Sequence, residues 1–226
     1  MLVFLILIVC GVGFGVRQFF RSRTQRSLRS EAIAFMEAGE YESAAGRLDE
    51  ALKLSGDKVG KFETDVLQYR AEANYQMGDY TAALACWQKL LEKDAENVLY
   101  KENAVLCMME TGDYEGALAM GVLQSRIYNR RAVERIQAED YDGALADIDL
   151  GMAADDGSAA ADLAYNQAVA YEGKLDFSRA LELFEAYVER FGADENAERE
   201  ITFLRSRQGS QGEAVQESSQ AAEPQA

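Results

Sequence analysis

The chain has 226 residues, with 23 Lys and Arg against 39 Asp and Glu, and its formal net charge is −16. It contains no histidine, which excludes imidazole acid–base catalysis, Ser-His and Cys-His nucleophile pairs and histidine metal ligands. The acidic balance argues against nucleic acid as a partner, because phosphate binding requires a basic face. Three cysteines without a C-x-x-C spacing favour neither a disulfide framework nor a zinc site.

The first element expected along the chain is an apolar helix over residues 1–20. Residues 2–16 carry no charge, and Phe19 and Phe20 extend the apolar run. A helix of this length is about 30 Å long, which matches the hydrocarbon core of a bilayer. The sequence therefore predicts a single transmembrane or signal-anchor helix, whose glycines at positions 11, 13 and 15 offer a face for self-association.

A basic juxtamembrane segment is expected at residues 21–30. Five arginines lie from Arg17 to Arg29, and none precedes the apolar run. Positive charge accumulates on the cytoplasmic side of membrane segments, so we expect a single-pass cell-membrane protein with a cytoplasmic C-terminal domain. The alternative is an extracytoplasmic protein held by a lipid on Cys10, although Val9 stands where the lipoprotein motif requires a small residue.

Residues 31–194 contain five copies of a short motif, which consists of a turn, an aromatic residue and an alanine three positions later. The aromatic residues are Tyr41, Tyr80, Tyr114, Tyr141 and Phe177. The alanines are Ala44, Ala83, Ala117, Ala144 and Ala180. The first three copies begin with glycine at positions 39, 78 and 112, and the last two begin with aspartate. A small residue after the aromatic allows two helices to approach closely.

Two further positions recur in each copy. The helix before the turn carries a small or modest residue at Ala32, Ala71, Val105, Ala132 and Ala168. The helix after it carries a large apolar residue at Leu48, Trp87, Ile148 and Phe184. With its period of roughly 34 residues, this pattern resembles the tetratricopeptide repeat family. The resemblance implies an all-α fold, a right-handed superhelical solenoid of helix-turn-helix repeats after the transmembrane helix, over approximately 25–58, 64–97, 98–124, 125–158 and 161–194.

The repeats are not evenly spaced. Successive aromatic residues are 39, 34, 27 and 36 residues apart, so the third interval lacks about two helical turns. We therefore expect a break between Gly121 and Ser125 rather than one helix from Tyr114 to Ala138. After the repeats, residues 195–207 are expected to form a capping helix. Residues 208–226 are rich in Gln, Ser, Gly and Glu and are predicted to be disordered.

The resemblance also implies where a partner binds. In this family the first helix of each repeat lines a concave surface that holds a protein or peptide. The corresponding positions are Gln68, Tyr69, Glu72, Tyr75, Glu102, Asn103, Leu106, Met109, Arg126, Asn129, Arg130, Val133, Tyr165, Asn166 and Val169. Their tyrosines and amides suit an extended peptide or a partner helix. The family's clamp for a C-terminal carboxylate is only partly matched, because Glu72 would repel that ligand.

Together these features predict a membrane-anchored scaffold for protein–protein interaction that is not an enzyme and needs no cofactor or metal. One alternative is an exported or lipid-anchored repeat protein in cell-envelope assembly. The other is a carboxylate-dependent enzyme, because paired acids are frequent in this chain and spacing does not show whether two of them converge.

Overall fold

The computed structural model describes the backbone of residues 2–56, 60–154 and 156–220, and the side chains of residues 16–56, 60–154 and 156–207. Over these ranges the regular elements are helices and no strand is formed, as the all-α prediction requires. The chain divides into two compact units, unit 1 over Met1–Val122 and unit 2 over Leu123–Ala226.

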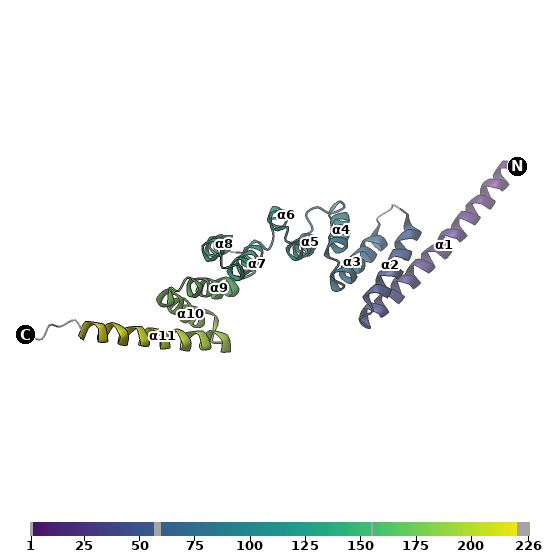
Figure 1. The fold of residues 1–226 in the computed structure, drawn as a ribbon. Coiled ribbons are helices and arrows are strands. Elements are labelled where there is room, and N and C mark those ends of the chain that lie inside the picture. Colours follow the sequence, from purple (N-terminus) through teal and green to yellow (C-terminus); the bar gives the residue numbers. More distant parts are fainter. Residues whose placement is uncertain (1, 57–59, 155, 221–226) are drawn as a thin grey trace, which may run out of the picture. The chain divides into compact units, whose positions relative to one another are not determined.

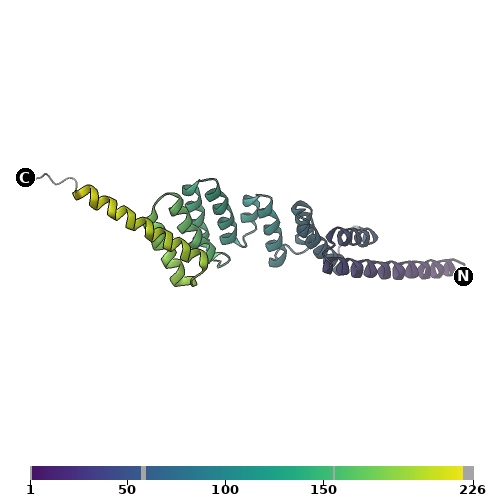
Figure 2. The same cartoon turned by 60° about the horizontal axis from the view of Figure 1, so that its bottom comes forward.

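Unit 1 contains six helices within its described residues (Figure 1). They are α1 (Leu2–Glu37), α2 (Tyr41–Ser55), α3 (Lys61–Gln76), α4 (Tyr80–Leu91), α5 (Val98–Glu110) and α6 (Tyr114–Ala119). Each helix packs against the next one in the chain, which is the connectivity of stacked helix-turn-helix units. The N-terminal part of α1 extends past α2 (Figure 2).

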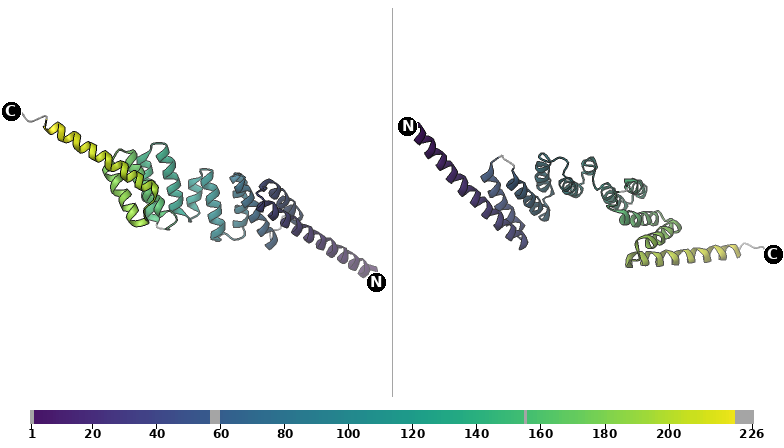
Figure 3. Two further views of the ribbon diagram at one scale, coloured as in Figure 1. Left: turned by 90° about the horizontal axis from the view of Figure 1, so that it is seen from below. Right: turned by 180° about the vertical axis from the view of Figure 1, so that it is seen from behind.

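Unit 2 contains five helices within its described residues. They are α7 (Gln124–Gln137), α8 (Tyr141–Ala154), α9 (Ala160–Gly173), α10 (Phe177–Phe191) and α11 (Glu195–Gln220). Consecutive helices pack against one another, and α7 also packs against α9 (Figure 3). Because α7 and α9 are the first helices of successive hairpins, their contact places them side by side on one face of the unit.

The residues that the repeat pattern assigns to helix contacts are buried. The five motif alanines and the five small residues of the preceding helices have no exposed surface. Leu48, Ile148 and Phe184 are also fully buried, and Trp87 is 5% exposed. Burying one such large side chain contributes roughly 1.5–3 kcal/mol, so these residues stabilise the packing of each hairpin. The predicted repeat pattern is confirmed at these positions.

The turn within each hairpin contains one residue in the left-handed region. In unit 1 this residue is glycine at positions 39, 78 and 112, each with φ of +76°. In unit 2 it is Glu139 with φ of +60° and Leu175 with φ of +63°. The next residue donates its backbone N–H to the carbonyl five residues earlier, at 2.8–3.0 Å in all five turns. This bond ends the first helix in the same way in both units.

The expected break between Gly121 and Ser125 is confirmed. The short helix α6 ends at Ala119, and α7 begins at Gln124. Between them the backbone turns at Gly121 and at Leu123, which have φ of +71° and +53°. The alternative of one helix from Tyr114 to Ala138 is therefore wrong.

The loop between α8 and α9 caps the start of α7, which has no side-chain cap of its own. The backbone N–H of Ser125 donates to the Asp156 carboxylate at 3.1 Å, and that of Arg126 donates to the Ser158 hydroxyl at 3.2 Å. The Ser125 hydroxyl donates to the Gly151 carbonyl at 2.8 Å. The two bonds from backbone N–H groups satisfy donors that every helix start leaves unpaired.

The two terminal helices differ from the predicted segments. The sequence separates residues 1–20 and 21–30 from the first repeat, whereas α1 is continuous, since no proline interrupts it. Buried Ala197 and Leu204 place α11 against α10, and α11 continues to Gln220 through residues predicted to be disordered. Gln, Glu and Ala favour helix there, and the only proline of the chain is Pro224. Residues 221–226 of the predicted tail lie outside the described residues.

Across the part of the chain that the structure describes, no helix is both long enough and apolar enough to span a bilayer. Most side chains of the predicted anchor, residues 1–15, lie outside the described residues.

Candidate functional site

The α3 residues predicted to bind a partner make contacts within unit 1. The Gln68 amide donates to the Tyr100 hydroxyl on α5 at 3.0 Å. The Arg29 guanidinium of α1 lies over the Tyr69 ring, 5.3 Å from its centroid. These contacts join α3 to the helices on both sides of it, so both side chains contribute to the packing of unit 1.

The other two α3 residues also have neighbours in the unit. The Glu72 carboxylate accepts a hydrogen bond from the Gln76 amide at 2.7 Å. Tyr75 packs edge-on against Tyr80 with ring centroids 5.1 Å apart, and burial raises the pKa of its phenol.

The predicted α5 residues are not equally accessible. Met109 is only 7% exposed, so a partner cannot reach it without a rearrangement. The Asn103 amide donates to the Leu99 carbonyl of its own helix at 2.7 Å. Glu102 and Leu106 are half-buried.

The predicted α7 and α9 residues approach one another in unit 2. The Asn166 amide of α9 donates to the Asn129 side-chain oxygen of α7 at 2.9 Å. Arg130 is exposed and lies 3.5 Å from Glu134, while Arg126 is exposed at the start of α7. Val133 is half-buried.

Two hollows in unit 2 lie beside α9. The first has a volume of about 510 Å³ and is polar. Its lining residues are Asn129, Asp162, Tyr165, Asn166, Tyr187, Asp194, Glu195 and Asn196. The second has a volume of about 560 Å³ and is richer in aromatic side chains. Its lining residues are Ile136, Tyr141, Tyr165, Val169, Glu172, Gly173, Leu175, Phe177, Glu200, Phe203 and Arg207.

Tyr165 lines both hollows, so together they follow α9 from its first turn to its last. We call this surface the α9 groove. The lining residues of α9 recur three or four positions apart, which places them on one face of that helix. The same spacing holds on α11 for Asn196, Glu200, Phe203 and Arg207. The groove therefore has a floor on α9 and a wall on α11.

Carboxylates dominate the charge of the groove. Burial, together with the nearby Glu200 carboxylate, raises the pKa of Glu172. Burial also raises the pKa of the Tyr165 phenol, and Glu200 and Asp194 add to the effect. Arg207 is the one cation among the lining residues, and its guanidinium lies 5.2 Å from the Phe203 ring centroid.

Of the residues predicted from the sequence, Asn129, Tyr165, Asn166 and Val169 line the groove. The prediction missed the whole contribution of α11. The signal was present, because Glu200, Phe203 and Arg207 share one helix face, whereas Ile201 and Leu204 share the face that packs on the last repeat. A capping role alone does not account for this second face of α11.

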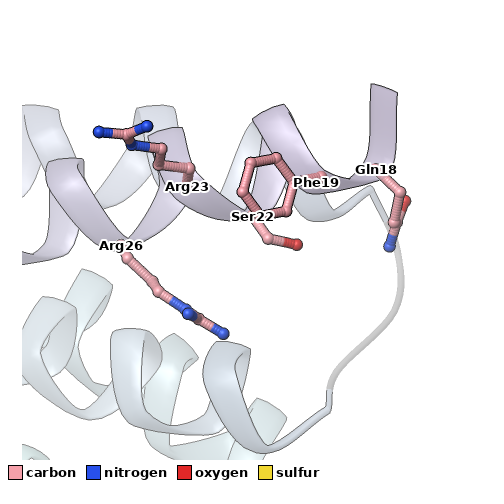
Figure 4. Close-up of a pocket in the computed structure, with 5 residues that line it drawn as sticks. All are labelled: Gln18, Phe19, Ser22, Arg23 and Arg26. Carbon is pink, nitrogen blue, oxygen red and sulfur yellow. The ribbon is translucent and has the colours of Figure 1, made fainter. Parts of the chain in front are cut away.

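A further hollow lies beside α1 in unit 1 (Figure 4). It has a volume of about 620 Å³ and is lined by Gln18, Phe19, Ser22, Arg23 and Arg26. Phe19 is 65% exposed, and both arginines are exposed. An apolar ring next to two cations suits an interface between hydrocarbon and anionic groups.

The described cysteines are not arranged as nucleophiles. Burial raises the pKa of the Cys86 thiol, and it raises that of Cys107 to about 11. Both thiols are therefore protonated at neutral pH, and a protonated thiol is a poor nucleophile. Among the residues that the structure describes, no group of three His, Cys, Asp or Glu side chains is placed to hold a metal ion.

The comparisons with known proteins agree with the repeat pattern. Residues 70–121 match the family model described as tetratricopeptide repeat. No protein of curated function matches the chain significantly.

Solved structures are similar to the chain over a longer range. A tetratricopeptide repeat protein from Parabacteroides merdae has a TM-score of 0.56 at 17% identity, over 89% of this chain and 81% of that one. MamA of strain AMB-1 has a TM-score of 0.48 at 18% identity, over 76% and 94% of the two chains. A thermophilic protein of this type from Thermus thermophilus has a TM-score of 0.40 at 15% identity, over 80% and 98%.

At these identities the likeness concerns the fold alone. The fold assignment depends on the Parabacteroides structure, since the other two TM-scores lie below 0.5. Folds of this type generally serve as protein-binding scaffolds without enzymatic activity. Residues 70–121 thus match the tetratricopeptide repeat, and the described chain has an all-helical, solenoid-like fold.

Proposed function

We propose that this protein is a membrane-anchored scaffold that binds a protein partner in the α9 groove. The observation that carries the proposal is the α9 groove, whose two hollows share Tyr165 and combine aromatic side chains with amides that lie at one end. Aromatic side chains supply contact area, and amides pair with a peptide backbone. Repeat proteins of this fold hold their partners on such surfaces.

The anchor in this proposal is the apolar segment at residues 1–20, with the following domain on the cytoplasmic side. Arg17 lies near the end of this segment and four more arginines follow it, of which Arg23 and Arg26 are exposed next to exposed Phe19. Arginines near an anionic leaflet are attracted by roughly 1 kcal/mol each, which would hold the basic part of α1 at the surface.

Crosslinking in the native host tests the partner site. The full-length chain, an Asn166→Ala/Phe203→Ala groove variant and a Gln137→Ala/Leu150→Ala control would be compared by mass spectrometry. The control also removes one amide and one exposed apolar side chain, but outside the groove. We expect a set of proteins that is captured by the wild type and the control and lost from the groove variant. Equal capture by all three chains would contradict the proposal.

Fractionation and protease treatment test the anchor and its orientation. We expect the full-length chain in the membrane fraction and a chain lacking residues 1–20 in the soluble fraction. In intact cells, protease should leave the C-terminal domain uncut. Cleavage of that domain on intact cells would instead favour the exported alternative.

A further inference from the structure

We propose that the segment bound in the α9 groove is cationic, an extended stretch of about six residues in which Lys or Arg alternates with apolar residues. This inference rests on the proposed function and specifies the chemistry of the partner. It is drawn from the charge of the groove, from the position of one carboxylate and from the dimensions of α9.

The charge of the groove is strongly one-sided. Five carboxylates line it, at Asp162, Glu172, Asp194, Glu195 and Glu200. The one lining cation is Arg207, whose guanidinium lies against the rings of Phe177 and Phe203. An arrangement of this kind attracts a positively charged segment and repels an acidic one.

Glu172 stands at a position that is apolar in the other repeats. Counting five residues back from the turn aromatic, the other four copies have Met36, Tyr75, Met109 and Ile136. In the last copy the position is a half-buried carboxylate beside Glu200, so two like charges are held together in a partly desolvated place. Packing alone does not require an acid there. A bound cation would neutralise both carboxylates and remove their repulsion.

The aromatic lining suits the same ligand. The rings of Tyr141, Phe177 and Phe203 line the second hollow together with Glu172 and Glu200. Arg207 already lies against Phe177 and Phe203, which shows that these rings accept a guanidinium, and aromatic rings also accept the apolar residues that alternate with the cations. At the other end, the Asn129 and Asn166 amides offer donors and acceptors to a peptide backbone.

The length of the groove sets the length of the segment. The 14 residues of α9 span about 21 Å, at 1.5 Å per residue. An extended chain rises roughly 3.3 Å per residue, so about six residues cover that distance. Alternate side chains of an extended segment point to opposite sides, so that apolar residues contact Tyr165 and Val169 while the cations between them reach Glu172 and Glu200.

Fluorescence anisotropy with three labelled octapeptides tests the inference on the full-length chain in detergent. All three peptides alternate leucine with a second residue, which is lysine, glutamine or glutamate. We expect the lysine peptide to bind at least about tenfold more tightly than the glutamine peptide, with an affinity that falls as salt is raised. The glutamate peptide should bind more weakly than the glutamine peptide.

Two double variants locate the effect. Glu172→Gln/Glu200→Gln should lower the affinity for the lysine peptide to that for the glutamine peptide and leave the latter unchanged. Glu189→Gln/Glu198→Gln removes the same charge from exposed positions outside the groove and should change neither affinity. An equal loss in both variants would show a general effect of net charge and overturn the inference.

The result also separates this inference from the proposed function. If the three peptides bind with equal affinity, or the glutamate peptide binds best, the cationic partner is wrong, whereas a groove-dependent partner found by crosslinking still supports the scaffold. If the lysine peptide binds as expected but crosslinking finds no groove-dependent protein, the chemistry of the groove is as inferred and its role as a scaffold is wrong.

Discussion

Units 1 and 2 form the same turn from different residues. In unit 1 the left-handed position is glycine, and in unit 2 it is Glu139 or Leu175, with φ only 13° to 16° smaller than the +76° of the glycines. A side chain in this region costs roughly 1–2 kcal/mol. The hydrogen bonds that end the first helix are the same in both units. The packing of the hairpin, rather than the residue type, therefore determines the conformation of this turn.

The units also differ in how they hold charge between helices. In unit 2 the Asp147 carboxylate is 1% exposed and lies 2.5 Å from Arg131 and 3.1 Å from Arg135. In unit 1 the comparable pair joins Arg70 to Asp49, whose side chain is 53% exposed. Among the described residues, unit 2 therefore has a fully buried carboxylate and non-glycine residues in the left-handed turn, whereas unit 1 has neither.

The largest expected effect comes from the buried apolar residues. Phe184→Ala should destabilise unit 2 by about 3–5 kcal/mol, and Leu48→Ala should destabilise unit 1 by about 2–5 kcal/mol, because each leaves a cavity. Hydrogen exchange on the full-length chain, read separately for residues 61–110 and 160–204, measures both. We expect each substitution to raise exchange in its own unit. If both units respond equally to either change, they cannot be compared as separate bodies.

The second largest difference in stability between the two units is expected at the buried ion pair. Asp147→Asn should cost about 2–3 kcal/mol, toward the lower limit for a broken buried pair because both arginines keep some contact with water. Asp49→Asn in unit 1 should cost less than about 1 kcal/mol. Chemical denaturation of the two variants measures the difference. Similar losses in the free energy of unfolding for the two variants would show that the burial of Asp147 does not increase its contribution to stability.

The turn itself is tested by exchanging the residues. Leu175→Gly should stabilise unit 2 by up to about 1 kcal/mol, because the gain from relieved backbone strain exceeds the entropy that glycine adds to the unfolded chain. Gly78→Ala should destabilise unit 1 by about 1–2 kcal/mol. Thermal unfolding provides the values. A loss of stability for the glycine variant would mean that the Leu175 side chain, which is 71% exposed, makes a stabilising contact.

The smallest effect concerns the cap on α7 and depends on pH. Desolvation raises the pKa of Asp156, but hydrogen bonds from Ser158 and Ser125 outweigh it and lower this pKa from 3.8 to about 2. The stabilisation is thus present above pH 3.8 and is lost as the pH falls through about 2. Asp156→Asn should cost roughly 1 kcal/mol at pH 7 and progressively less toward pH 2.

Circular dichroism melts at several pH values check this cap prediction. Asp149→Asn, an exposed acid on α8, serves as the control and should change little. If the cost of Asp156→Asn is the same at pH 2 and pH 7, the carboxylate is not the cap.

Much of the fold could be predicted from residue type and spacing. The alanine three positions after each aromatic must be small for the helices to meet, and all five are buried. The missing two turns after Tyr114 located the break near Gly121. The end of α11 could not be predicted in this way, because Gln, Glu and Ala are compatible with either a helix or a disordered tail.

The site was predicted less completely. Family positions identified Asn129, Tyr165, Asn166 and Val169, but they did not show that Met109 is buried or that Gln68 is bonded to Tyr100. Those facts depend on side-chain contacts between helices that the spacing of a single repeat does not contain. The contribution of α11 required knowing that this helix packs beside α9 with a second face toward the groove.

The loop that caps α7 has a consequence for how such chains can be recombined. Asp156 and Ser158 follow Leu123 in the sequence, so the donors at the start of α7 are satisfied from within residues 123–226. A gene segment that begins at residue 123 would therefore encode the residues that cap the first turn of α7. Shuffling of repeat genes could therefore join this second half to a different first half without designing a new helix start.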